Sequence, residues 1–214
     1  MIFISNYIII LFIGGLLGIS SYFISLWLIA NISHHILPKS RIIHILYAII
    51  WCLFNSLSWY CISLIKKGIS TCAIEIMILF SICLIISAVD YVTFKVPNIM
   101  LIALLVVCLF FLIINYDLNK IFMHIFSFVG GFVIFMMPLL FGKSSSWGDV
   151  KYASIISLYL GFYKSLIAYA IMSVVILLFF IYSSAFKKVL INAPFAMAPF
   201  MSLGFIATLL YLLN

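Results

Sequence analysis

Long apolar runs with almost no charge constrain this chain more than any other feature of its sequence. Of its 214 residues, 68% are hydrophobic and only 7% are charged, whereas soluble domains are about 25% charged. That composition excludes a soluble globular domain, a disordered chain and a nucleic-acid-binding protein. The sequence therefore predicts a protein that lies in the lipid bilayer.

Eight apolar segments follow one another with short polar connections. Most are close to the ~20 residues that a helix needs to cross the hydrocarbon core while satisfying its own backbone groups. The run 150–186 is interrupted at Gly161 and at Tyr163–Lys164, which favours two helices over one long bent helix. We expect an all-α, polytopic transmembrane helix bundle of about eight helices, forming a single integral-membrane domain over residues 1–214. The segments are Tyr7–Ala30, Ile42–Ile65, Thr71–Val89, Ile99–Asn115, Ile121–Phe141, Val150–Phe162, Ser165–Phe186 and Phe195–Leu213.

The basic residues give an orientation. The net charge of +7 reflects 11 Lys and Arg against only 4 Asp and Glu, so it is a shortage of acids rather than a basic patch. With eight spans and an outside N-terminus, seven basic residues fall in inside loops and four in outside loops, which agrees with the positive-inside rule. The inside set is Lys39, Arg41, Lys95, Lys143, Lys151, Lys187 and Lys188, and the outside set is Lys66, Lys67, Lys120 and Lys164.

Small residues inside the segments predict close helix contacts. Gly14 and Gly18 form a G-x-x-x-G pair in the first segment, and Gly130 and Gly131 are adjacent in the fifth. Glycines allow two helix backbones to approach closely in a membrane. We expect both sites to pack inside the bundle.

Two of the four acidic residues have simple structural explanations. Asp117 lies in a polar turn and is expected to be a solvated loop carboxylate. Glu75 lies one helical turn from the start of the third segment, where it can pair with Lys66 or Lys67. We expect a structural role for Glu75.

Asp90 and Asp149 are different, because an ionisable residue at the edge of a membrane helix is expensive and is a functional candidate by default. Asp90 ends the third segment, and Asp149 follows a polar loop and precedes the sixth. They lie 59 positions apart, a separation that accommodates two membrane crossings. An even number of crossings returns the chain to the same side, so both carboxyl groups are predicted at the cytoplasmic ends of helices.

Two neighbouring carboxyl groups suit aspartic peptide hydrolysis. They share one proton, so that one takes a proton from water while the other donates one to the substrate carbonyl oxygen. Gly148 removes a side chain just before Asp149, which would let a substrate strand approach the backbone. The alternative is that each aspartate caps a helix end or pairs with a loop lysine, Lys95 or Lys151.

The residues around both aspartates resemble the type IV prepilin peptidases, the G-x-G-D class of membrane aspartic proteases. Gly148-Asp149-Val150-Lys151 is similar to the family's second-aspartate motif. Asp90 followed by Pro97-Asn98 resembles the first-aspartate motif, and Ala198–Gly204 is similar to a C-terminal apolar stretch that contains Pro and Gly.

The resemblance implies a multi-pass aspartic endopeptidase of the bacterial inner membrane. Its partners would be the lipid bilayer and type IV prepilins or related pseudopilins, whose short basic leader is removed at the cytoplasmic face. It implies that Asp90 and Asp149 are catalytic and that Gly148, Pro97 and Lys151 support them. Many relatives also methylate the new N-terminus with S-adenosylmethionine, so that cofactor is implied if methylation is retained.

The sequence departs from the family pattern at Ser146, which stands where the motif G-x-G-D has its first glycine. Serine is small, so we expect the loop to tolerate it unless the position requires a positive φ angle.

A second departure is the missing cysteine-rich cytoplasmic loop, since residues 31–41 contain no cysteine. The five cysteines lie in apolar runs without a C-x-x-C pair, so neither a zinc site nor a disulfide framework is indicated. His34, His35 and nearby His44 are expected to be solvated rather than metal ligands. We therefore expect cleavage to need no cofactor and no metal, and we leave methyltransferase activity open.

Three other interpretations remain at this point. An intramembrane aspartic protease of the presenilin or signal-peptide-peptidase kind would carry a Pro-Ala-Leu motif, which is absent. A non-catalytic transporter, or a scaffold for pilus or secretion assembly, would pair its acids with lysines, and a carrier usually places a charge mid-span. An inactive homologue altered at Ser146 is the third.

Overall fold

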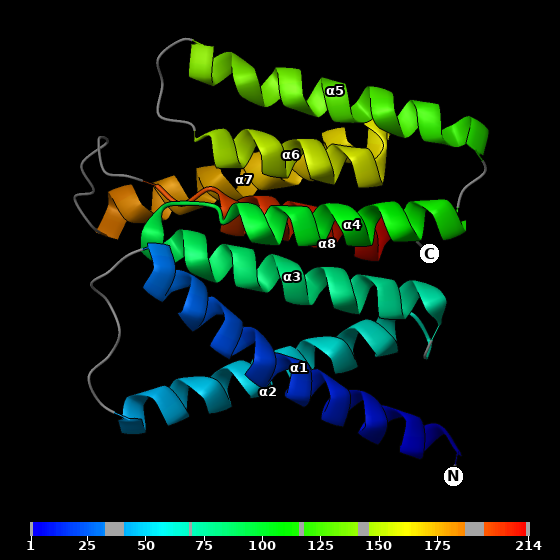
Figure 1. Ribbon diagram of the computed structural model, residues 1–214, viewed down its shortest axis with the longest axis vertical. Coiled ribbons are helices and arrows are strands. Elements are labelled where there is room, and N and C mark those ends of the chain that lie inside the picture. Colours follow the sequence, from blue (N-terminus) through cyan, green and yellow to red (C-terminus); the bar gives the residue numbers. More distant parts are fainter. Residues whose placement is uncertain are drawn as a thin grey trace.

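The computed structural model describes residues 2–32, 41–68, 70–115, 118–140, 146–186 and 195–212. Within these ranges the chain forms eight α-helices and no strand, which confirms the all-α prediction (Figure 1). The helices are α1 (Ile2–Ile32), α2 (Arg41–Ile65), α3 (Thr71–Thr93), α4 (Asn98–Asn115), α5 (Leu118–Leu140), α6 (Trp147–Leu160), α7 (Phe162–Phe186) and α8 (Ala198–Leu212).

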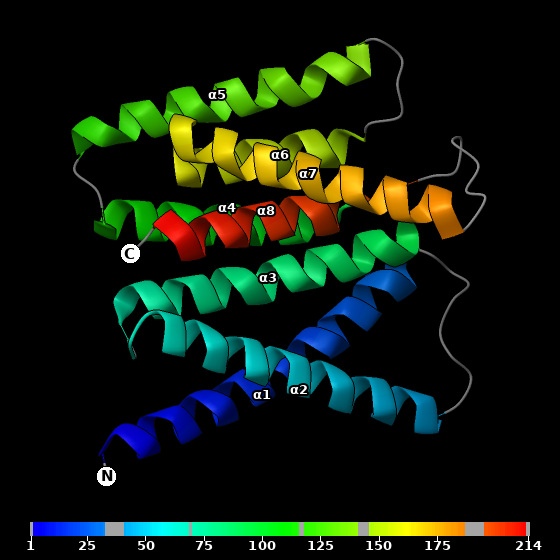
Figure 2. The ribbon, with the colours of Figure 1, turned by 180° about the vertical axis from the view of Figure 1, so that it is seen from behind.

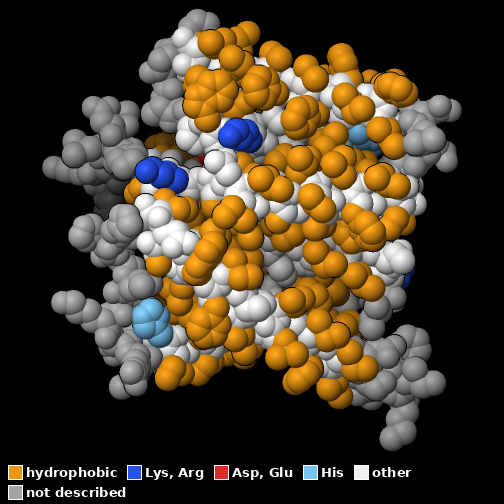
Figure 3. Space-filling view, in the orientation of Figure 1, with side chains coloured by type: hydrophobic (Ala, Val, Ile, Leu, Met, Phe, Trp, Pro, Cys, Tyr) orange, Lys and Arg blue, Asp and Glu red, His pale blue; other side chains and the backbone are white. Residues whose placement is uncertain are grey.

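Six helices of the described chain, α1 to α5 and α7, are long and apolar enough to cross a membrane. Apolar side chains cover most of the face seen in Figure 3, as expected for a surface in contact with lipid. The chain is therefore a multi-pass membrane protein. Helices α6 and α8 have only 14 and 15 residues, so eight complete spans stay a prediction.

Successive helices from α3 to α8 run in alternating directions (Figures 1 and 2). The last turns of α3, α5 and α7 and the first turns of α4, α6 and α8 consequently meet at one end of the bundle, on the left in Figure 1. We call this the site end. It contains both aspartates that the sequence singled out.

Helix α6 lies at the centre of the bundle and contacts α4, α5, α7 and α8. From Asp149 to Leu160 every residue except Lys151 is buried. A helix that is buried on all sides is an interior element rather than a lipid-facing one. The predicted packing role of the α5 glycines is seen at Gly131, where an added Cβ would lie 2.8 Å from Cβ of Ser157.

The predicted break in the run 150–186 is confirmed at Gly161. This residue has φ = 78°, a conformation that favours glycine, and it ends α6. His124 of α5 covers the break, because its Nδ1 donates a hydrogen bond of 2.7 Å to the carbonyl of Leu158. The Leu158 carbonyl, which lies in the last turn of a buried helix where backbone donors are missing, thereby receives a hydrogen bond.

Helices α1 and α2 cross each other along a seam of small residues, as the G-x-x-x-G pair predicts. An added Cβ on Gly18 would lie 2.9 Å from Cα of Cys52, and one on Gly14 would lie 3.1 Å from Trp59. Asn55 of α2 donates a hydrogen bond of 2.7 Å to the carbonyl of Gly14. Backbone contact and a polar bridge therefore hold this pair together.

Candidate active site

Asp90 lies in the last turn of α3, and the local sequence ends the helix directly after it. Phe94 adopts the left-handed conformation (φ = 53°), and its N–H donates a hydrogen bond of 2.7 Å to the Asp90 carbonyl. Pro97 is buried and precedes α4, and its carbonyl accepts a hydrogen bond from the N–H of Leu101. Since proline fixes φ, the chain reverses within a few residues and holds Asp90 at the helix end.

Asp149 lies in the first turn of α6, in a capping box with Ser146. The Asp149 N–H donates to Oγ of Ser146 at 3.2 Å, and Oδ2 of Asp149 accepts from the backbone N of Ser146 at 3.1 Å and from its Oγ at 2.9 Å. Ser146 has φ = −88°, so this position needs no glycine. Serine in place of the motif glycine therefore leaves the turn intact and adds a donor to the carboxyl group.

The structure brings Asp90 and Asp149 together at the site end, as the spacing predicts. Both are buried, with only 3% and 6% of their surface exposed, and their charges interact electrostatically. The start of α6 rests on the segment after α3, because an added Cβ on Gly148 would lie 2.8 Å from Cβ of Val96. Val96 therefore leaves no room for a side chain at position 148, and the approach of a substrate strand to Gly148 stays a prediction.

Helix α8 completes the surroundings of Asp90. The N–H of Ala198, its first residue, donates a hydrogen bond of 3.0 Å to Oδ2 of Asp90. A helix N-terminus binds anions through its free N–H groups and its dipole. The apolar stretch that begins at Ala198 therefore takes part in the site through its backbone.

A buried polar network lies one helical turn away from the two aspartates and joins the same three helices. Oγ of Ser202 (α8) is 2.7 Å from the hydroxyl of Tyr152 (α6) and 2.8 Å from Oγ of Ser87 (α3). Tyr152 also donates to Sγ of Cys83 at 3.2 Å. Ser87 precedes Asp90 by one turn and Tyr152 follows Asp149 by one turn, so the network fixes the separation of the helices that carry the carboxyl groups.

The alternative roles of the two aspartates are only partly seen. Both accept backbone hydrogen bonds at helix N-termini. Asp149 is the third residue of α6 in a capping box whose N-cap is Ser146, and Asp90 accepts from the first residue of α8. Neither carboxyl group bonds to a lysine among the described residues, and Lys151 is exposed and donates to Oδ1 of Asn98 at 3.2 Å. Lys151 therefore ties α6 to the start of α4, as a supporting residue would.

The capping box uses only one of the two carboxyl oxygens of Asp149. Oδ1 of Asp149 is buried and has no hydrogen-bond partner among the described residues. Burial raises the pKa of Asp149 above its ordinary value, and the hydrogen bonds from Ser146 partly oppose this increase. An unpartnered buried carboxyl oxygen is a group on which a reacting water or substrate can be held.

The other candidate residues lie apart from this pair. Glu75 is buried near the opposite end of α3 and accepts a hydrogen bond of 3.0 Å from the side-chain amide of Asn115, a partner that the sequence did not predict, and its structural role stays a prediction. Asp117, His34 and His35 lie outside the described residues. His44 accepts or donates a 3.1 Å hydrogen bond with the hydroxyl of Tyr22.

Metal ligands do not gather in the described part of the chain. No group of three or more His, Cys, Asp or Glu side chains there could hold an ion. None of the five cysteines forms a disulfide bond in the structure.

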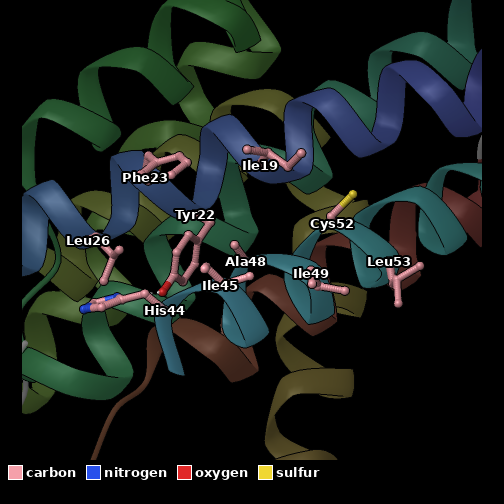
Figure 4. A pocket seen from close by; sticks show the side chains of 10 residues that line it. All are labelled: Ile19, Tyr22, Phe23, Leu26, His44, Ile45, Ala48, Ile49, Cys52 and Leu53. Carbon is pink, nitrogen blue, oxygen red and sulfur yellow. Dashed lines mark hydrogen bonds between the residues drawn. The ribbon is translucent and has the colours of Figure 1, made fainter. Parts of the chain in front are cut away.

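Among the described residues, three grooves open on the sides of the bundle, and the surface of each is mostly apolar. One of about 330 Å³ lies between α4, α5 and α6 with Lys151 and Asn98 among its lining residues, and one of about 430 Å³ lies between α3 and α8 and includes Ser87 and Ser202. The largest, about 570 Å³, lies between α1 and α2, with His44 beside Tyr22 at one end (Figure 4). None of the three includes a carboxyl group.

Several site residues were missed by reasoning from the sequence. The pattern Ser146-x-x-Asp149 is a capping-box signal and could have linked Ser146 to the carboxyl group. Tyr152 and Ser202 carried no signal beyond being polar in apolar helices. Ala198 contributes only a backbone N–H, which its side chain does not encode.

The model of the type IV leader peptidase family matches residues 77–181 of the chain. No curated protein and no solved structure matches it. The matched segment begins before Asp90 and ends after Lys151, so it contains both aspartates, Pro97 and Gly148, whereas Ala198–Gly204 lies beyond it. Over this segment, which is just under half of the chain, the protein is similar to the type IV leader peptidase family.

Proposed function

We propose that this protein is an aspartic endopeptidase that removes the short basic leader from type IV prepilins or pseudopilins. The observation that carries the proposal is the pair of buried carboxyl groups, Asp90 and Asp149, which interact at one end of the bundle inside the segment matched by the leader peptidase family.

The chemistry requires a water molecule and one proton held between the two carboxyl groups. The ionised carboxylate takes a proton from water while the new O–C bond forms at the scissile carbonyl, and the protonated carboxyl gives its proton to the carbonyl oxygen. In the second step the first carboxyl passes its proton to the amide nitrogen, the C–N bond breaks, and the second carboxyl takes a proton back from the diol. One water is consumed and the pair returns to its starting state.

The position of the pair supports cleavage at the membrane surface rather than in the middle of the bilayer. Asp90 and Asp149 lie in terminal turns of α3 and α6. The lysine bias of the loops predicts that this end is cytoplasmic. We therefore propose a single peptidase domain of the bacterial inner membrane that receives its substrate from the cytoplasmic side, with Pro97, Gly148 and Lys151 holding the loops around the carboxyl groups.

Methylation of the new N-terminus has less support from the structure than leader cleavage has. S-adenosylmethionine carries an amino acid group, a ribose and an adenine, all of which need polar partners. The three grooves of the described residues have apolar walls and do not fit that cofactor. We therefore assign no methyl-transfer step. Cleavage itself is proposed to need neither metal nor cofactor, because its chemistry uses only water and two carboxyl groups.

The proposal is tested with the full-length protein in detergent or proteoliposomes and a prepilin that carries its basic leader, with mass spectrometry of the product N-terminus. Asp90→Asn and Asp149→Asn should each lower the cleavage rate by at least about 100-fold, because general acid–base chemistry contributes that much. Asparagine still presents an oxygen to the donors on each carboxyl group, so both helix caps and the fold should persist.

The unfolding midpoint of each Asn variant provides the control, and the corresponding Ala variants show what loss of the cap alone does. Full cleavage by either Asn variant would remove that aspartate from catalysis. No cleavage of any leader-bearing prepilin by the wild-type protein would contradict the proposed function itself.

A further inference from the structure

The two carboxyl groups of the proposed active site are held in different surroundings, and the difference divides their roles. Asp149 occupies the first turn of α6, where the helix dipole favours a negative charge. Asp90 occupies the last turn of α3, where the dipole of its own helix opposes a negative charge and only the N-terminus of the neighbouring α8 favours one.

The hydrogen bonds show the same asymmetry. Oδ2 of Asp149 accepts from the backbone N–H and from the hydroxyl of Ser146, at 3.1 and 2.9 Å. Asp90 accepts one hydrogen bond among the described residues, from the N–H of Ala198 at 3.0 Å. Hydrogen bonds to an ionised acceptor are roughly twice as strong as neutral ones, so the group with more donors is the better carboxylate.

The remaining oxygen of Asp149 is placed to react. Both donors from Ser146 lie on Oδ2, which leaves Oδ1 buried without a partner among the described residues. A buried polar atom left unpaired costs free energy, and a water or substrate group held there relieves that cost.

We propose that Asp149 is the ionised member of the pair, which takes the proton from water through Oδ1, and that Asp90 carries the shared proton to the substrate carbonyl. Ser146 is then a positioning residue, whose hydroxyl holds Oδ2 and keeps the negative charge on Asp149. The assignment rests on the proposed function. On this assignment, the serine that replaces the motif glycine at position 146 supports the reaction and does not abolish it.

Among the described residues, few other charged groups lie near this carboxylate. Asp90 of α3 is the acid that faces it. Lys95 in the segment before α4 is exposed, Lys151 bonds to Asn98, and Tyr182 near the end of α7 is exposed. The described parts of α5 and α8 place no acidic or basic residue at the site end.

The test is the pH dependence of kcat/KM for leader removal by the full-length protein. The acidic limb of that profile reports the group that must be ionised. In Ser146→Ala the hydroxyl donor is lost and the pKa of the Asp149 carboxyl rises, so the limb should move to higher pH by about one unit. Ser146→Thr keeps the hydroxyl and should restore the wild-type limb.

Ser154→Ala is the matched control. Ser154 is buried on the same helix, and its Oγ donates to the carbonyl of Val150 at 2.7 Å rather than to a carboxyl group. A merely structural effect lowers the active fraction at every pH without moving the limb, so this variant should keep the wild-type limb.

Two results separate the role assignment from the proposed function. If Ser146→Ala leaves the limb unmoved or moves it to lower pH while the Asn variants of Asp90 and Asp149 are inactive, the assignment is wrong and the aspartic mechanism stands. If the wild-type protein cleaves no leader, the proposed function fails first. A shift in Ser146→Ala that Ser146→Thr reverses supports the assignment.

Discussion

The helix pair α1–α2 and the group α3, α6 and α8 are packed by different means. In the pair, glycines bring the backbones together, so that Gly18 lies against Cα of Cys52. In the group, side-chain hydroxyls of Tyr152, Ser202 and Ser87 bridge three helices, and a backbone N–H of α8 binds Asp90. Both solutions hold helices in lipid, where burial of apolar surface gives little driving force between them.

The two regions differ in whether the separation of the helices or also their register must be held constant. Small-residue packing sets how close two helices lie but tolerates small shifts along them. A network of directional hydrogen bonds fixes helices in register, which two carboxyl groups need in order to share a proton. We therefore expect mutations in α1–α2 to change stability and mutations in the group of three to change the rate of cleavage.

Gly148→Ala should have the largest effect of the predictions that follow. The new Cβ would lie 2.8 Å from Cβ of Val96, so the start of α6 must move and Asp149 with it. We expect kcat to fall by at least about 10-fold, since small misplacements of catalytic groups are costly. Single-turnover kinetics measures it, and a wild-type kcat would show that the carboxyl geometry tolerates the shift.

Tyr152→Phe should lower kcat by about 3- to 10-fold, because it removes the hydroxyl that joins α6 to α8 near the pair. The effects of Tyr152→Phe and Ser202→Ala should be less than additive, since both break the same contact. Tyr169→Phe is the control, as its hydroxyl bonds to Ser157 and to the carbonyl of Ala153 and to none of Tyr152, Ser202 and Ser87. Equal losses of kcat in Tyr152→Phe and Tyr169→Phe would contradict a specific role for the network.

Gly18→Ala should leave the cleavage rate of folded protein unchanged and lower the free energy of unfolding by about 1–3 kcal/mol. The reason is that the added methyl group meets the Cys52 backbone, which cannot rotate away. Denaturation in detergent, with cleavage normalised to folded protein, separates the two quantities. A reduced rate per folded molecule would show that α1–α2 and the carboxyl pair are coupled.

Chelators should have no measurable effect on cleavage, because the proposed reaction uses only water and two carboxyl groups. Replacing His34 and His35 together by alanine should leave the rate within about 3-fold of wild type, as expected for solvated residues. Cleavage assays with and without EDTA check both statements. Loss of cleavage in either case would require a metal in the mechanism.

The fold was accessible from the sequence because lipid imposes simple rules. Apolar length predicted the helices, and Gly161 predicted the break between α6 and α7 because only a residue without a side chain adopts its φ easily. The spacing of Asp90 and Asp149 predicted that both lie at one end of the bundle, since two crossings separate them.

The detailed site was less accessible, because its geometry depends on contacts between distant segments. The bond from Ala198 to Asp90 joins residues 108 positions apart and uses no side chain of Ala198. The contact of Gly148 with Val96 was not predicted, because only the packing of α6 on the segment after α3 reveals it, and the predicted room for a substrate strand stays a prediction. Hydrophobic pattern determines which segments cross the membrane and carries little information on how their ends meet.

The short length of α6 has a consequence for the depth at which Asp149 lies in the membrane. Fourteen residues make a helix of about 21 Å, against about 30 Å of hydrocarbon. Because its neighbours surround it, α6 does not have to match the thickness of the bilayer, and the longer helices carry that mismatch instead. The level of Asp149 relative to the lipid headgroups is therefore set by packing within the protein, so a charged group can remain at a fixed depth when the thickness of the membrane changes.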